Sequence, residues 1–439
     1  MATPSLAMIP TSYKATKLYS VLPTDGVGDF DVTRPSIATR VNKSGLIKEV
    51  AANVPRLDYL DGGCPSLLTE NQSTNLEEWS QDASRRGMTR VTIDSNTSIA
   101  PDGGLTADGL VSSVDNNSHR LGGYYPSSLS ADATFTYSAF YKKGFSRYIK
   151  LRITDDTANT GGNANRYEWL FDLELGVYVD ERQRYGTSLY PHYKIEDYGD
   201  GWYRISCGFT KNGDNTRLDV SSFIMRSDNI IQESFAGDAT TIDTYIWGIQ
   251  LEEQSQSTSY IKTSGSVITR NADVINGAGD SSTFNSSEGT LYFEGSALAG
   301  DLTYRYISIN DGTAGNVIRL GYRASSNGVI FHSDPSDLFT TSSLNLYILN
   351  NNVISAKLDY INTDITQINK IAAKWKLNDF ALWVNGVEVA TDNNGNTPTG
   401  LNSLNFDIAN MLHFYGKTKD LRVYNTALSD AELIELTTL

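Results

Sequence analysis

The 439-residue chain has little cysteine, little histidine and no long apolar run, and each shortage removes a class of protein. The two cysteines, Cys64 and Cys207, lie far apart and cannot form the disulfide framework of a small secreted domain. The four histidines do not have the spacing of a zinc site or a catalytic triad. No apolar run approaches the roughly 18 residues of a membrane span. We therefore expect no metal, no cofactor and no membrane insertion.

Positive charge is also scarce, because 36 Lys and Arg face 51 Asp and Glu, a net charge of −15. Proteins that bind nucleic acid or anionic membranes need a basic face, so we expect neither partner. The N-terminus lacks a basic region and two prolines interrupt it, so we expect no signal peptide and folding in a reducing cytoplasm. The 36 glycines and 25 tyrosines instead indicate an all-β protein with many turns.

Residues 1–75 differ from the rest because they hold six of the eleven prolines. Proline removes a backbone donor and confines strands to sheet edges. Only short extended pieces lie between these prolines, and such a segment cannot easily bury a core alone. We expect an extended N-terminal anchoring arm that orders against a partner or against copies of itself.

Two later regions show the pattern of antiparallel β-sandwiches. In residues 76–263, short alternating runs such as 148–153 recur between Gly, Asn and Asp turns, which predicts a jelly roll. Residues 264–288 are rich in Ser, Gly, Asn and Asp and are expected to be a linker. Residues 289–439 form a second sandwich, with a type I′ hairpin at Asn385-Gly386. Ser429 and Glu432 form the capping box of one short C-terminal helix.

Three carboxylates of one β-rich segment, Glu168, Asp172 and Glu174, share a parity. On a strand they would point to one face. Glycosidases place a nucleophile and a general acid in this way. One hypothesis is therefore a glycan-cleaving site, and the alternative is a solvated strand face with ordinary acidic residues.

A polar segment carries a cluster of aromatic side chains that could stack on sugar faces. The glycan-binding candidates are Tyr185, Tyr190, His192, Tyr193 and Tyr198. The alternative is that these rings pack between loops or against a neighbouring subunit. Oxygen-rich turns at 310–312 and 392–395 lack the spacing of a calcium loop, and turn chemistry explains them.

The chain up to about residue 273 resembles bacteriophage virion fibre proteins, known as head fibres, head spikes or tail fibres. In the arm, the resemblance is carried by RPSIATRVN at 34–42, GLI at 45–47, VPRLDY at 54–59 and LLTE at 67–70. Farther along it is carried by FDL at 171–173, DGWYR at 200–204, GIQLE at 248–252 and SYI at 259–261. In that family the FDL strand is a scaffold element, which disfavours the glycosidase hypothesis.

The last 150 residues resemble a laminin-G/concanavalin A-like lectin domain. The carriers are LWVNGVEV at 382–389 and KDLRVYNTALSDAEL at 419–433. Such domains in phage proteins often bind glycans, although these motifs fix no ligand residue. In the arm, we assign virion attachment or oligomerisation to Tyr13, Tyr19, Arg34, Arg40, Arg56 and Tyr59.

Together these observations predict a fold and a function. We expect an extended arm, a jelly roll and a lectin-like sandwich in a structural protein of a phage virion, displayed as a head fibre or spike. The resemblance implies a homotrimer on the virion surface, assembled in the host cytoplasm, with other virion proteins and host cell-surface glycans as partners and no enzymatic activity. The alternatives are a tail fibre that binds the receptor, a shell-stabilising protein that binds nothing, and a glycan-degrading enzyme using Glu168, Asp172 or Glu174.

Overall fold

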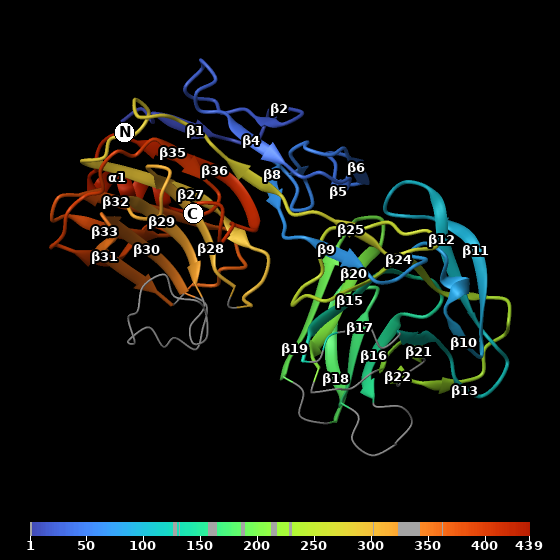
Figure 1. Cartoon of the computed structure of the whole chain (residues 1–439). Helices are drawn as coiled ribbons and strands as arrows, with labels where there is room; N and C mark the ends of the chain where they lie inside the picture. The colour runs from blue at the N-terminus through green and yellow to red at the C-terminus, as the bar shows by residue number, and fades with distance from the viewer. Residues whose placement is uncertain are drawn as a thin grey trace. The chain divides into compact units, whose positions relative to one another are not determined.

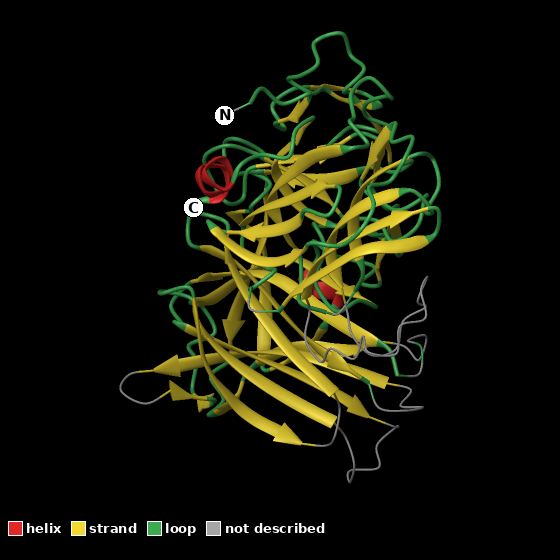
Figure 2. Ribbon diagram, turned by 90° about the vertical axis from the view of Figure 1, so that its left-hand side faces the viewer, coloured by secondary structure: helices red, strands yellow, loops and turns green. Residues whose placement is uncertain are grey.

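The computed structural model describes residues 2–125, 130, 132–156, 165–185, 189–211, 217–227, 231–301, 303–323, 343–361 and 363–439. These residues form antiparallel β-sheets (Figure 1), which confirms the predicted all-β class. The described chain has two short helices, η1 (Ala83–Arg85) and α1 (Asp430–Thr437), drawn red in Figure 2. Neither helix is long and apolar enough to cross a membrane.

The chain divides into two compact units. We call Ser44–Glu49 with Gln72–Arg270 the jelly-roll unit, and Met1–Lys43, Val50–Asn71 and Asn271–Leu439 the terminal unit. The sequence predicted boundaries between functional regions at residues 75, 263 and 288. The division into units follows contacts instead and joins both ends of the chain in one unit, so these boundaries stay a prediction.

Two sheets form the jelly-roll unit. The first has the order β10-β14-β21-β16-β17-β18, with bounds β10 (Gly87–Thr89), β14 (Arg120–Tyr125), β21 (Arg217–Ser227), β16 (Tyr148–Asp156), β17 (Asn165–Asp172) and β18 (Val177–Tyr185). The second has the order β11-β12-β24-β15-β20-β19, with bounds β11 (Val91–Ile99), β12 (Leu105–Ser112), β24 (Ile242–Glu252), β15 (Thr134–Lys143), β20 (Trp202–Thr210) and β19 (Leu189–Asp197). Short strands complete it: β6 (Ile47–Val50, whose last residue falls in the terminal unit), β9 (Ser73–Asn75), β13 (Asn117–Ser118), β22 (Ile231–Gln232), β23 (Ser234–Phe235) and β25 (Ile268–Arg270).

The order of these strands is that of a jelly roll. Numbering β12, β14, β15, β16, β17, β20, β21 and β24 from 1 to 8 along the chain gives the sheets 1-8-3-6 and 2-7-4-5. This is the double Greek key of a jelly roll, so the predicted topology is confirmed. Alternation places Tyr137, Trp169 and Cys207 in the core between the sheets, and burial raises the pKa of the Cys207 thiol.

Two further sheets form the terminal unit. One has the order β34-β33-β32-β27-β36-β8-β7 with β1 also on β36, and bounds β34 (Val387–Asp392), β33 (Phe380–Val384), β32 (Asn369–Lys376), β27 (Glu288–Ala297), β36 (Gly416–Tyr424), β8 (Ser66–Thr69), β7 (Leu57–Asp58) and β1 (Leu6–Met8). The other has the order β31-β30-β29-β28-β35, with bounds β31 (Val353–Tyr360), β30 (Ser343–Asn350), β29 (Val317–Arg323), β28 (Arg305–Asn310) and β35 (Ser403–Asn405). The remaining strands are β2 (Tyr13–Lys14), β3 (Lys17–Leu18), β4 (Phe30–Thr33), β5 (Ala38–Val41) and β26 (Val274–Asn276).

Local signals in the terminal unit act as the sequence predicts. Asn385 and Gly386 join β33 to β34 with φ of 50° and 85°, as a type I′ turn requires. Ser429 and Glu432 form the predicted capping box of α1.

The N-terminal segment supplies strands and core residues to the terminal unit. Strand β1 pairs with β36 from Leu6↔Val423 to Met8↔Leu421, and the side chains of Leu6, Met8 and Leu67 lie in the same core as β27 and β36. The apolar side chains of the arm are therefore buried by residues near the other end of the same chain.

Candidate functional site

The three described aromatic candidates lie on β19 and just beyond it, with different surroundings. The Tyr193 ring stacks on Tyr178 with centroids 4.0 Å apart and is 46% exposed. The His192 Nε2 atom lies 2.8 Å from Thr136 Oγ1, and the Tyr198 ring packs edge-on against Phe140 at 4.8 Å.

These contacts separate the candidates onto two faces. Successive side chains of a strand point to opposite sides of a sheet. His192 and Tyr198 contact the face of β15 turned away from the core, while Tyr193 lies at the core edge with Phe171. The structure therefore does not bring the three together. The side chains of Tyr185 and Tyr190 lie outside the described residues.

The carboxylates of the candidate strand are held by cations. Glu168 is buried, with Lys150 Nζ at 2.8 Å, Arg152 Nε at 2.5 Å and Arg166 Nη2 at 2.7 Å from its carboxylate oxygens. Burial alone would raise the pKa of Glu168, but its bonds and charge contacts with Lys150 and Arg152 outweigh burial and hold the pKa below its usual value.

Asp172 lies on the same face of β17 as Glu168, as the shared parity predicts. Burial opposes its ionisation, but bonds from Arg147 and from the backbone of Glu174 and Leu175 lower its pKa. Glu174 follows the strand, is 46% exposed, and pairs with Lys143 and Arg147. A glycosidase acid needs a raised pKa, so neither buried carboxylate has the environment of a general acid.

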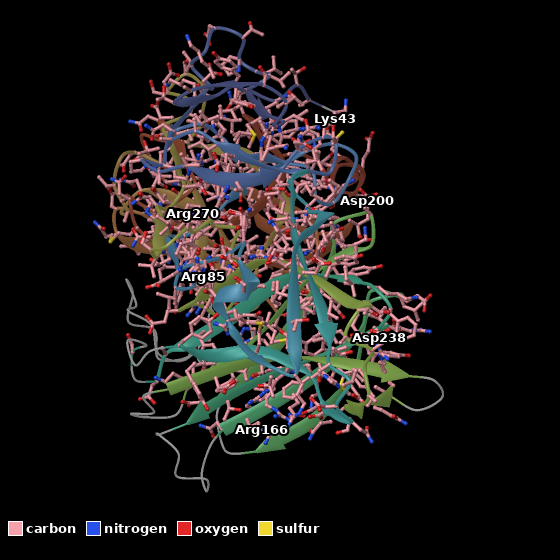
Figure 3. All side chains as sticks on the ribbon, turned by 90° about the vertical axis from the view of Figure 1, so that its right-hand side faces the viewer. Lys43, Arg85, Arg166, Asp200, Asp238 and Arg270 are labelled. Atoms are coloured by element: carbon pink, nitrogen blue, oxygen red, sulfur yellow. The ribbon has the colours of Figure 1, made fainter. Side chains whose placement is uncertain are left out.

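Cations from neighbouring strands surround one aromatic ring on this face. The set, which we call the Phe223 cluster, comprises Arg120, Lys150, Arg152, Arg166, Glu168, Phe223 and Glu233. Three cationic groups lie over the Phe223 ring, at 4.5 Å (Lys150), 4.2 Å (Arg152) and 5.7 Å (Arg120) from its centroid. Figure 3 marks Arg166 among the green strands of the jelly-roll unit.

The Phe223 cluster has an excess of positive charge. Among the described side chains of this cluster, four cations (Arg120, Lys150, Arg152 and Arg166) face two carboxylates (Glu168 and Glu233), so their balance is 4 − 2 = +2 in a chain of net charge −15. Burial lowers the pKa of Arg152 and the like charge of Arg166 lowers it further, although Glu168 opposes both.

Part of the Phe223 cluster is accessible. Arg152, Arg166 and Glu233 have side chains 18%, 28% and 37% exposed. Arg152 donates through Nε and Arg166 through Nε and Nη2, so each keeps N–H groups for an anion. The chain's sequence contained a signal for this face, since Lys150 and Arg152 alternate with the apolar residues of 149–153, but the ring and the facing strands could not be identified without the register.

The residues predicted to attach the protein to the virion form two groups, those that are buried and those that are not. Arg34 and Arg56 are buried and pair with Asp273, and Arg34 also donates to the carbonyls of Val54 and Ala51. These two arginines hold the terminal unit together and present no surface to a partner. The Arg40 guanidinium lies 3.3 Å from the hydroxyl of exposed Tyr13, and Tyr19 and Tyr59 are half-buried, so attachment through these four stays a prediction.

The described residues contain no group of three His, Cys, Asp or Glu positioned to hold a metal ion. No protein-family model and no curated protein sequence matches the chain.

Several solved structures are similar to parts of it. One is the CBM40 of the Ruminococcus gnavus IT-sialidase bound to alpha2,3 sialyllactose, at 20% identity over 35% of this chain and 84% of that one, with a TM-score of 0.28. Another is the NanB sialidase from Streptococcus pneumoniae, at 13% identity over 36% of this chain and 25% of that one, with a TM-score of 0.28. A third structure contains domains LG4-5 of the mouse laminin alpha1 chain, at 12% identity over 72% of this chain and 90% of that one, with a TM-score of 0.22. The fold described above rests on the chain's own strand order.

Proposed function

We propose that this chain is a structural protein of a bacteriophage virion, a head fibre or spike that holds the particle to acidic glycans of the host surface. The virion role rests on the resemblance of residues up to about 273 to phage fibre proteins. The glycan role is carried by one observation, the cationic Phe223 cluster on an outer face of the jelly-roll unit. The proposed activity is binding and not catalysis.

The chemistry of the Phe223 cluster favours an anionic sugar. Guanidinium groups bind carboxylates and sulfates through paired N–H donors, and Arg152 and Arg166 lie side by side on Glu168. The charge of −15 on the whole chain opposes binding of long polyanions such as nucleic acid. Weak single contacts become useful when many copies on one particle bind together.

Glycan binding is tested with the full chain on an array of sialylated, uronate-bearing and sulfated glycans and their neutral counterparts. The variant is Arg152→Gln/Arg166→Gln. The matched control is Arg85→Gln/Lys194→Gln, which removes the same charge from residues 57% exposed outside the cluster. We expect the variant to lose acidic-glycan binding and the control to keep it. An equal loss of acidic-glycan binding in both would show that net charge alone causes the effect. Binding to neutral glycans alone would contradict the proposal.

Position and assembly are tested on particles and on the purified protein. Gold-labelled antibody on intact virions should mark the head, and label on the tail would favour the alternative of a receptor-binding tail fibre. Light scattering should give about three times the 48.2 kDa chain mass. A single-chain mass that persists at high concentration would contradict the trimer.

A further inference from the structure

The Phe223 cluster covers only part of the outer face of its sheet, and a row of polar side chains continues beyond it. The register places Tyr124 of β14 beside Asp219 of β21. Thr154 of β16 lies between Asp219 and Arg166 of β17. These four residues, which we call the Tyr124 row, alternate with side chains of the core, so they share the face that carries the cluster. Arg166 is the residue that the row and the cluster have in common.

The Tyr124 row is accessible at both ends. Tyr124 is 57% exposed, the Arg166 side chain is 28% exposed, and Asp219 and Thr154 between them are half-buried. Neighbouring strands lie about 4.8 Å apart, so the three steps from Tyr124 to Arg166 span about 14 Å. One sugar ring is shorter than this, so a glycan that touches both ends must contain at least two sugar residues.

The two ends of the row differ in charge. Arg166 lies beside Arg152 in the cationic cluster, where both donate to the same carboxylate. Asp219 stands beside Tyr124 at the other end, and its carboxylate accepts a hydrogen bond from Ser221 Oγ at 2.8 Å. A carboxylate accepts hydrogen bonds from sugar hydroxyls but repels a second acidic group. The face therefore suits an acidic sugar at one end and a neutral sugar at the other.

The exposed ring of Tyr124 favours the same order of sugars. The face of an aromatic ring carries partial negative charge, so it packs against the apolar C–H face of a sugar and not against a carboxylate. Arg152 and Arg166 instead bind a carboxylate through paired N–H donors. Ring and charge thus point to the same preference at each end of the row.

We propose that this face binds a glycan in which an acidic residue is followed by a neutral one. The proposal rests on the proposed function and narrows its ligand class. The acidic residue binds Arg152 and Arg166, and the glycan then crosses β16 and β21. The neutral residue lies against Tyr124 and donates a hydroxyl hydrogen bond to Asp219. A glycan built only of acidic residues binds more weakly, because its next carboxylate meets Asp219.

The test measures binding of oligosaccharides to the full chain by calorimetry at low ionic strength. The acidic–neutral probes are a hyaluronan tetrasaccharide and a sialylated galactose. The all-acidic probes are tetragalacturonic acid and disialic acid, and the neutral probe is cellotetraose. We expect one acidic–neutral probe to bind about tenfold more tightly than the all-acidic probe of the same acid class.

The outcomes separate this proposal from the function on which it rests. If an all-acidic probe bound as tightly as its acidic–neutral counterpart or more tightly, the order of sugars would be overturned and acidic-glycan binding would stand. Binding of no acidic probe would contradict the proposed function, and this inference would fall with it. A preference for cellotetraose would overturn both.

Tyr124→Ala tests the neutral end of the row. We expect it to weaken the acidic–neutral probe by about fivefold or more and to leave binding of the acidic monosaccharide unchanged, since Arg166 lies about 14 Å away. The control is Phe145→Ala, which removes a ring 61% exposed in the loop before β16. A loss of monosaccharide binding in Tyr124→Ala, or an equal effect in the control, would overturn the assignment of Tyr124.

Asp219→Asn tests the exclusion of a second acidic sugar. We expect it to strengthen binding of the all-acidic probe by about threefold or more at low ionic strength, with a smaller gain at high salt. The control Asp94→Asn removes the same charge from an exposed position of β11 in the other sheet. An equal gain in both variants would show that net charge alone causes it and would overturn the role of Asp219. Circular dichroism checks that each variant folds.

Discussion

Two buried cations, one in each unit, sit over aromatic rings at the same distance but are neutralised differently. Lys150 Nζ and the Arg319 guanidinium each lie 4.5 Å from a ring centroid, of Phe223 and Tyr347 respectively. Lys150 is paired with Glu168 at 2.8 Å and Glu233 at 2.5 Å, whereas Arg319 has no carboxylate among the described residues. Carboxylates thus neutralise the charge of Lys150, whereas no described carboxylate neutralises the charge of Arg319.

This difference separates a buried cation that carboxylates neutralise from one that no described carboxylate neutralises. Breaking a buried pair leaves an uncompensated charge, so the partners of Lys150 contribute stability. A charge that is already uncompensated costs stability. The two units can therefore be compared by the sign of the stability change that follows loss of a charge.

The largest expected effect is that of Glu168→Gln. The substitution leaves Lys150, Arg152 and Arg166 without their shared carboxylate, so we expect the jelly-roll unit to lose about 3–5 kcal/mol. Urea unfolding followed by hydrogen exchange within that unit measures the loss. Glu174→Gln is the control, because its side chain is 46% exposed and should change stability by about 0.5 kcal/mol or less. An equal loss of stability in the two variants would show that Glu168 is not the carboxylate that neutralises these cations.

Acid should reduce the same stabilisation. Because the folded-state pKa of Glu168 lies below its unfolded value of about 4.3, its contribution is present above that pH and is lost as the pH falls through the folded pKa. The difference in unfolding free energy between wild type and Glu168→Gln should therefore narrow below about pH 4.

Asp359 in the terminal unit should respond in the opposite direction. Burial raises its pKa, so its contribution is present below the unfolded value of about 3.9 and is lost as the pH rises through the folded pKa. Asp359→Asn should accordingly stabilise the unit at neutral pH, with the gain vanishing in acid. A gain that stays constant with pH would contradict this assignment.

Substitution of the two cations compares the units directly. Lys150→Met should destabilise the jelly-roll unit by about 1–2 kcal/mol, less than Glu168→Gln, because Glu168 keeps two arginines. Arg319→Met should leave the terminal unit unchanged or more stable by about 1 kcal/mol, since it removes an unpaired charge. Urea midpoints of both variants test the signs. Destabilisation by Arg319→Met comparable to that by Lys150→Met would mean that Arg319 is structural.

The sequence predicted the positions of strands better than it predicted the side-chain contacts between them. Period-two alternation identified the strands of the jelly roll, and parity placed Glu168 and Asp172 on one face. It could not identify Lys150 as the partner of Glu168, because that contact depends on the register of two strands. The buried Arg34 could not be told from a surface arginine, since its partner Asp273 lies 239 residues away.

The sequence held only a weak signal for the surroundings of Arg319. Arg319 and Arg323 lie four residues apart in β29, which places them on the same face of the strand. The lack of a described carboxylate beside Arg319 is a property of the folded face and cannot be read from the sequence. The local pattern therefore determines which side of a strand a charge occupies, and the fold determines whether that charge is neutralised.

The smallest expected effect on glycan binding concerns Tyr193, which belongs to neither cationic face. Its ring stacks on Tyr178 at the edge of the jelly roll and is 46% exposed, so Tyr193→Ala should cost about 0.5–1.5 kcal/mol. Acidic-glycan binding should persist in this variant, because Arg152 and Arg166 project from the outer face of a different sheet. Tyr178→Ala should cost a similar amount, since each change removes the same stack. If Tyr193→Ala instead abolished binding at unchanged stability, the sugar would stack on the aromatic edge of the jelly roll, and the Phe223 cluster would not be the glycan site.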